Sequence, residues 1–156
     1  MTKDAPTLLA GLAADDAAEV EALGSRTRVA SGEVIFELGD AAESLFVLES
    51  GRVALSLPMK VRGAEQDVLI EERAPGQAFG WSALVPPHRF TLKASTSMES
   101  EVLALPRAAL LEHFAQRPEV GYAVTRNVAA VVGQRLQVLQ AMWLREMQRV
   151  VELSDA

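Results

Sequence analysis

The sequence predicts a mainly β domain, built as a sandwich or a barrel, with helices at both ends. Short β-rich runs separated by glycines fill residues 26–105, and many short strands with regular turns are typical of these two architectures. Residues 7–24 have the pattern of one or two short helices, and residues 107–153 that of further helices. Because 156 residues fit one domain of ordinary size, we expect a single domain over residues 1–156.

The N-terminal helical segment carries a start signal and a stop signal. Asp16 stands three positions before Glu19, which is the spacing of a capping box, and Gly24 suits a helix C-terminus. We therefore expect Asp16 to open the second helix of this segment and Gly24 to close it.

Five hydrophobic runs within residues 26–105 have the length and the β-branched or aromatic content of strands. Glycines lie at or beside the turns between them, where glycine accepts a positive φ at little steric cost. Asp40, after Gly39, is a further tight-turn signal because aspartate bonds nearby backbone N–H groups. The predicted strand segments are residues 34–36, 45–48, 53–55, 68–70 and 102–105.

A long helix is predicted after Arg117-Pro118, which breaks the chain behind Pro106 and a short helix over residues 107–115. About 30 helical residues reach about 45 Å, further than one small domain covers. The helix either folds back as the last core helix or pairs with its twin across a two-fold axis, and its length favours pairing. One face carries Val124, Val128, Val132, Leu136, Leu139, Trp143, Met147 and Val150, of which Val128, Val132, Leu136, Leu139 and Trp143 form the predicted homodimer interface.

Composition excludes several classes of function. The chain has no cysteine, which excludes disulfides, thiolate metal sites and cysteine nucleophiles. A formal net charge of −6 opposes direct binding to nucleic acid, since phosphate contacts need clustered Lys and Arg. No apolar stretch is long enough to cross a membrane and the first residues lack a hydrophobic signal segment. We therefore expect a cytoplasmic protein without a membrane or nucleic-acid partner.

An ordered series of six short motifs carries a family resemblance. The motifs are Gly32-Glu33-Val34-Ile35-Phe36, Gly39-Asp40, Leu45-Phe46-Val47-Leu48, Ser50-Gly51-Arg52-Val53, Pro75-Gly76 and Phe79-Gly80. In this order they resemble the cyclic nucleotide-binding domain family, which includes the sensor domains of bacterial catabolite-activator-like (Crp/Fnr-like) regulators. The resemblance implies an eight-stranded jelly-roll β-barrel, or double-stranded β-helix, with N-terminal helices and a long C-terminal helix. No room follows Ala156 for the helix-turn-helix domain of such regulators, so we expect a stand-alone module.

The resemblance also implies a binding site for a small anionic ligand such as cyclic AMP or cyclic GMP. In the family, the segment that begins at Phe-Gly binds the cyclic phosphate through backbone N–H groups and an arginine, while a glutamate accepts the ribose hydroxyl. Trp81 replaces that glutamate, and an indole N–H only donates hydrogen bonds. Arg89 and His88 are the two candidates for the phosphate-contacting position. The candidate ligand-binding residues are Phe79, Gly80, Trp81, Ser82, Ala83, His88, Arg89 and Thr91.

Ordinary structural roles stand beside these candidates. Arg89 fits a solvated loop arginine, Ser82 a helix N-cap, and Trp81 a residue that fills the mouth of the domain. The two histidines, His88 and His113, are too few and too far apart in the sequence for a metal site of the cupin type, and only residue type supports haem ligation by either.

Glu71 and Glu72 are adjacent on a predicted strand, so their side chains point to opposite faces and do not form a catalytic pair. We expect both carboxylates to lie on the solvated surface, and we find no set of residues for catalysis. Two functional hypotheses remain. The first is a dimeric sensor whose C-terminal helices relay ligand binding to a partner protein; the second is a ligand-free, homodimeric protein-interaction module that keeps only the fold.

Overall fold

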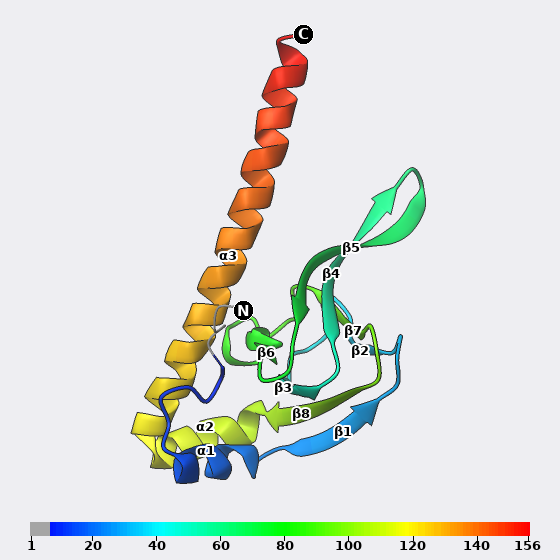
Figure 1. Cartoon of the computed structure of the whole chain (residues 1–156). Coiled ribbons are helices and arrows are strands. Elements are labelled where there is room, and N and C mark those ends of the chain that lie inside the picture. Colours follow the sequence, from blue (N-terminus) through cyan, green and yellow to red (C-terminus); the bar gives the residue numbers. More distant parts are fainter. Residues whose placement is uncertain (1–6) are drawn as a thin grey trace.

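The computed structural model describes residues 7–156, and it places eight strands of this part in two antiparallel sheets (Figure 1). The first sheet has the order β1-β8-β3-β6 and the second the order β2-β7-β4-β5. The strands of the first sheet are β1 (Ser25–Val29), β3 (Ser44–Ser50), β6 (Ala78–Phe79) and β8 (Ser100–Pro106). Those of the second are β2 (Val34–Phe36), β4 (Val53–Val61), β5 (Ala64–Arg73) and β7 (Lys93–Thr96).

The mainly β architecture with flanking helices is thus confirmed, while closure into a barrel is not observed. Within residues 7–156 each sheet is an open, four-stranded sheet with two free edges. All five predicted strand segments fall inside observed strands. β1, β6 and β7 were not among them, because they are short and partly polar and therefore give a weak periodicity signal.

The longest strand pair, β4 and β5, forms a hairpin that projects beyond the rest of the two sheets (Figure 1). Val61 pairs with Ala64 across a two-residue turn. Both turn residues, Arg62 and Gly63, have positive φ, at 52° and 82°. Two successive positive φ angles match the twist of a tight hairpin, which is why a glycine is needed in one of these positions.

Three helices lie at the ends of the chain: α1 (Ala14–Glu21), α2 (Arg107–Gln116) and α3 (Pro118–Ser154). The prediction that Asp16 opens a helix, the second of the N-terminal segment, is wrong. The helix begins at Ala14 behind the N-cap Ala13, and Asp16 lies in its first turn. α3 starts with Pro118 in its first turn, where the missing N–H costs no hydrogen bond.

The hydrophobic core lies between the two sheets and continues under the helices. Leu45 and Leu103 of the first sheet and Leu55 of the second are at most 2% exposed, and Val20 of α1 and Leu110 of α2 are fully buried. The first half of α3 adds Val120, Val124, Val128 and Val131 to this core. No helix within the described part of the chain is long and apolar enough to cross a membrane.

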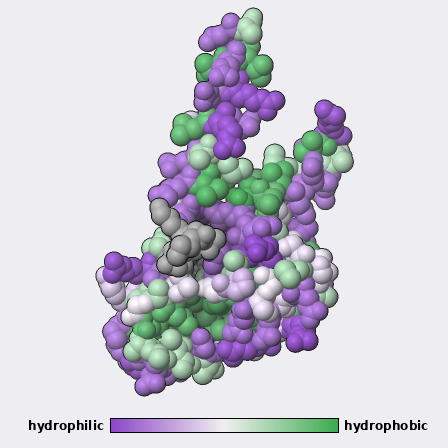
Figure 2. Space-filling model, in the orientation of Figure 1, coloured by the Kyte–Doolittle hydropathy of each residue, from purple (hydrophilic) through white to green (hydrophobic). Residues whose placement is uncertain are grey.

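The second half of α3 leaves the body of the protein and stands free (Figure 1). Arg135 is the last buried residue of the helix, and none of the residues from 136 to 154 is buried. Hydrophobic side chains nevertheless continue along this part, as the green patches on the protruding helix in Figure 2 show. They include Leu136, Leu139, Trp143, Met147 and Val150, each at least 41% exposed.

Candidate functional site

The predicted ligand segment begins where β6 ends and turns directly into a short 3₁₀ helix, η1 (Trp81–Leu84). Gly80 joins the two with a φ of 77°. A Cβ at this position would lie 3.0 Å from the ring of Phe46 and 3.2 Å from that of Phe90. Only glycine accepts both the positive φ and the close approach of the rings.

Four phenylalanine rings fill the space next to this turn. Phe36 and Phe90 stack with ring centroids 3.6 Å apart, and Phe46 and Phe79 stack at 5.3 Å. Phe36 also lies 5.7 Å from Phe46, so the two stacks form one aromatic cluster between the sheets. The half-buried Trp81 packs against the core beside it.

The cavity that remains is small. Its lining consists of Phe36, Leu55, Gly80, Trp81, Ser82, Phe90, Thr91, Leu92 and Arg135. Its volume is about 10 Å³. This is room for about one water molecule, whereas sites for small organic ligands measure about 300 Å³ or more. The structure is therefore closed to a nucleotide at this position.

Six of the eight predicted ligand residues line the cavity or lie in the core. Gly80, Trp81, Ser82 and Thr91 line the cavity. Phe79 and Ala83 are fully buried core residues.

His88 and Arg89, the two candidates for the phosphate contact, do not line this cavity. His88 Nδ1 lies 3.1 Å from the carbonyl oxygen of Ser82, and the exposed Arg89 donates from Nη1 to the carbonyl oxygen of Gly39 at 3.2 Å. The short bridge between Ala41 and Arg89 runs this loop along residues 39–42, so the phosphate contact predicted for Arg89 or His88 stays a prediction.

The charged group at the cavity is Arg135, which comes from α3. Its side chain is 7% exposed, and its Nε lies 3.1 Å from Oε2 of Glu71 on β5. Arg73, also 7% exposed, donates from Nη2 to the same oxygen at 2.7 Å. We call Glu71, Arg73 and Arg135 the buried triad.

The buried triad corrects the expectation that Glu71 lies on the solvated surface. Its side chain is 12% exposed, while that of the adjacent Glu72 is 43% exposed and lies 3.5 Å from Arg52. The alternation along β5 is as expected, but the inner face carries charges. Sequence signals for this did exist: Arg73 follows Glu71 by two positions, on the same strand face, and Arg135 follows the buried Val131 by one helical turn.

The side chains of both arginines of the buried triad are only 7% exposed. The pKa of Arg73 is lowered, chiefly because burial disfavours the charged form, with the Glu71 carboxylate opposing this and the nearby Arg135 adding to it. Nε of Arg73 and Nε of Arg135 are buried, and neither has a hydrogen-bond acceptor within the described residues. The geometry of the Arg135–Glu71 contact is that of an ion pair without an aligned hydrogen bond.

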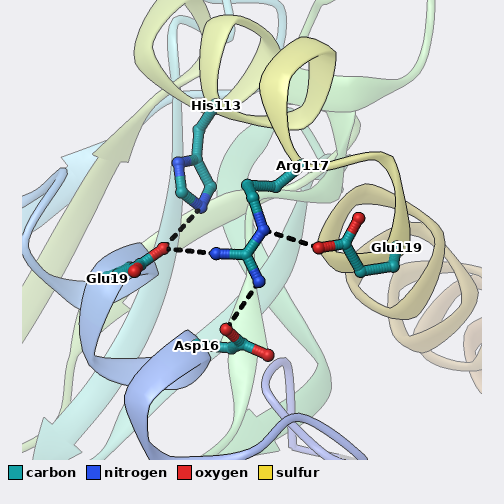
Figure 3. Close-up of polar contacts among 5 residues, drawn as sticks. All are labelled: Asp16, Glu19, His113, Arg117 and Glu119. Atoms are coloured by element: carbon teal, nitrogen blue, oxygen red, sulfur yellow. Dashed lines mark hydrogen bonds and ion pairs between the residues drawn. The ribbon is translucent and has the colours of Figure 1, made fainter.

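A second charged cluster holds the elbow between α2 and α3 (Figure 3). Arg117 donates to Asp16 Oδ1 at 2.8 Å and to Glu19 Oε2 at 3.0 Å, both on α1, and also to Glu119 on α3. The hydrogen bonds to Glu119 and, after it, to Asp16 raise the pKa of Arg117. His113 of α2 adds its Nε2 at 3.8 Å from Glu19. Asp16 thus fixes α1 against the elbow instead of capping its own helix.

The predicted dimer residues also divide. Val128 is 4% exposed and belongs to the core, and Val132 packs against the core. Both were assigned to the interface because sequence periodicity does not show where the body of the protein stops covering the helix. Leu136, Leu139 and Trp143 are 57%, 41% and 61% exposed and stay available.

Metal ligation finds no support in the geometry of the described residues: within 7–156, no three His, Asp or Glu side chains are grouped so that they could hold a metal ion.

Comparisons with known proteins agree on the family. The model of the "Cyclic nucleotide-binding domain" family matches residues 26–117. A solved structure of a putative cyclic nucleotide-binding protein from Geobacter metallireducens is 26% identical, with a TM-score of 0.67 over 83% of this chain and 91% of that one. The catabolite activator protein of Thermus thermophilus is 26% identical, with a TM-score of 0.69 over 95% of this chain and 62% of that one.

Curated relatives give a further match. Glutaminase 1 of Bradyrhizobium diazoefficiens is 33% identical over 138 residues, which are 86% of this chain and 21% of that protein. The chain thus spans about a fifth of the length of the curated relatives that it matches. Together with the two-sheet fold and the turn at Gly80, the family match over residues 26–117 shows that this chain belongs to the cyclic nucleotide-binding domain family.

Proposed function

We propose that this domain is a non-catalytic regulatory module that acts as a homodimer through the second half of α3, with its internal cavity closed to cyclic nucleotides. The observation that carries the proposal is the exposed hydrophobic stripe on the free half of α3. Membership of a regulatory domain family and the neighbouring catabolite activator protein support the regulatory role.

The stripe has the geometry of a helix-pairing surface. Leu136, Leu139, Trp143, Met147 and Val150 follow one another at spacings of three or four residues, so they share one face of the helix. Contiguous exposed apolar surface of this kind marks an interaction site. A second copy of the chain offers the same face, and a two-fold axis brings two such faces together without leaving an open end.

The cavity favours this function over cyclic-nucleotide sensing. The space of about 10 Å³ holds no nucleotide, the predicted Arg89 is bonded elsewhere, and Arg135 is held by Glu71. Trp81 lines the cavity where the family has its ribose-binding glutamate. A sensor function would need Trp81 and the neighbouring rings to move outward before the ligand enters.

Sedimentation equilibrium tests the proposal. The wild-type domain is expected to sediment as a dimer, and Leu139→Glu or Trp143→Glu as a monomer, because each places a charge in the paired stripe. Ala141→Glu is the matched control: it adds the same charge on the opposite face of the helix and should leave the dimer intact. A monomeric wild type, or equal dissociation by Ala141→Glu and Leu139→Glu, would refute pairing through this stripe.

Calorimetry separates the two functional hypotheses. Titration of the wild-type domain with cyclic AMP and cyclic GMP up to about 1 mM should give no binding heat, although even a binding free energy of about −4 kcal/mol is detectable there. Saturable binding would show that the cavity opens in solution and would favour the sensor hypothesis. Binding that is retained after Arg135→Gln would further place the ligand away from the buried triad.

A further inference from the structure

The buried triad has a net charge of +1 when all three side chains are ionised. Two guanidinium groups face one carboxylate, and all three side chains are between 7% and 12% exposed. A buried charge without a partner is costly, so such charges in proteins are paired or bind an ion. The two Nε–H groups without acceptors, on Arg73 and Arg135, mark the same deficit in hydrogen bonds.

The lining of the cavity determines the sign of any ion it holds. Arg135 lines the cavity together with Trp81, Ser82 and Thr91, whose indole N–H and hydroxyl groups are hydrogen-bond donors. No carboxylate lines it. Ser82 is 3% exposed, and no hydrogen bond among residues 7–156 involves its hydroxyl group. A positively charged, donor-rich wall attracts an anion and repels a cation.

Volume and charge together determine the size of that anion. The cavity of about 10 Å³ admits a particle about as large as a water molecule. The surplus of the triad is a single charge, given by two arginines and one glutamate. Among monovalent anions a single halide ion comes nearest to both conditions, whereas phosphate, a carboxylic acid or a nucleotide is far larger.

We propose that this cavity is a halide site, in which Arg135 and Ser82 bind one chloride ion that balances the buried triad. The ion would lie between η1 and Arg135 of α3 and would thereby tie α3 to the body of the domain. The proposal does not depend on α3 pairing, because the triad and the cavity lie within one chain.

Thermal unfolding at constant ionic strength is the first test. Replacing 150 mM sodium gluconate by sodium chloride should raise the Tm of the wild-type domain by about 3 °C, since a ligand that binds only the folded state stabilises it. Bromide should act like chloride. Arg135→Gln and Ser82→Ala should each reduce this shift to below about 1 °C. Arg89→Gln is the control, because that arginine is exposed and does not line the cavity.

Anomalous diffraction from crystals of the wild-type domain in sodium bromide locates the ion directly, and it does not depend on the stability of any variant. We expect a bromide peak in contact with Arg135 and Ser82. Equal Tm values in chloride and gluconate, or an anomalous map without a peak at Arg135, would overturn the proposal and leave a water molecule in the cavity. A shift caused by phosphate or cyclic AMP and not by chloride would overturn the size argument, and with it the proposal.

Discussion

Removal of the Glu71 carboxylate should destabilise the domain more than loss of any other single side-chain charge in the triad. Glu71→Gln keeps the shape of the side chain but leaves Arg73 and Arg135, whose side chains are both 7% exposed, without a counter-charge. Breaking a buried ion pair by removing one partner costs about 3–5 kcal/mol, and here both contacts, at 2.7 and 3.1 Å, are lost together. We expect a loss of about 4 kcal/mol in the free energy of unfolding.

Urea denaturation followed by circular dichroism measures this loss. With an m-value of about 2 kcal/mol/M for a domain of this size, the midpoint should fall by about 2 M. Glu72→Gln is the matched control on the same strand. Its carboxylate is 43% exposed and 3.5 Å from a half-exposed arginine, and a surface pair of this kind contributes at most about 1 kcal/mol.

Removal of Arg135 should destabilise the domain much less than removal of the Glu71 carboxylate. Arg135→Gln removes the surplus cation and leaves Arg73 and Glu71 as a neutral pair at 2.7 Å, so it should cost only about 1–2 kcal/mol. If Glu71→Gln and Arg135→Gln destabilise the domain equally, or if Glu71→Gln costs less than about 1 kcal/mol, the triad does not carry the charge imbalance that we derive from it.

Two further predictions concern a turn and the elbow. Gly51 has a φ of 92° and a Cβ there would lie 2.7 Å from Cα of Ser100, whereas Gly63, with a φ of 82°, has open space around it. Gly51→Ala should therefore cost about 2–4 kcal/mol in urea denaturation and Gly63→Ala about 1 kcal/mol, and equal losses would contradict the steric argument. The hydrogen bond from Arg117 lowers the pKa of Glu119 below its ordinary value of 4.5. The resulting stability is present above that value and is lost as the pH falls through the lowered folded-state pKa. Glu119→Gln should flatten the stability profile of the domain between about pH 5 and pH 3 in low salt, and a variant profile identical to the wild type would exclude this contribution.

Local sequence patterns were sufficient for the elements and their order. Strand runs such as residues 45–48 alternate with turn glycines, and the three- and four-residue spacing from Val124 to Val150 is a property of the helix itself. The same holds for Asp40, whose Oδ2 accepts the backbone N–H of Glu37 at 3.1 Å, as its turn position predicts. These features follow from neighbours in sequence, so the sequence reveals them.

The candidate site depended on contacts between distant segments. Glu71 and Arg135 lie far apart in the sequence. Strand alternation and helix spacing indicate the buried face of each element, but no local pattern pairs the two charges; the packing of α3 against β5 brings them together. The same packing places Arg135 at the cavity, whereas Arg89 donates to the carbonyl oxygen of Gly39.

The long helix α3 shows most clearly which features the sequence determines and which depend on tertiary packing. Its sequence determined that one face is hydrophobic from Val124 onward, but it did not determine which part of that face is covered. Val128 belongs to the core and is 4% exposed, whereas Trp143, on the free half of the helix, is 61% exposed. Burial depends on what other parts of the chain occupy the space beside a residue. For this reason the sequence alone determined the elements, their order and the hydrophobic face, and only the tertiary structure decided which residues form the core, the cavity and the free surface.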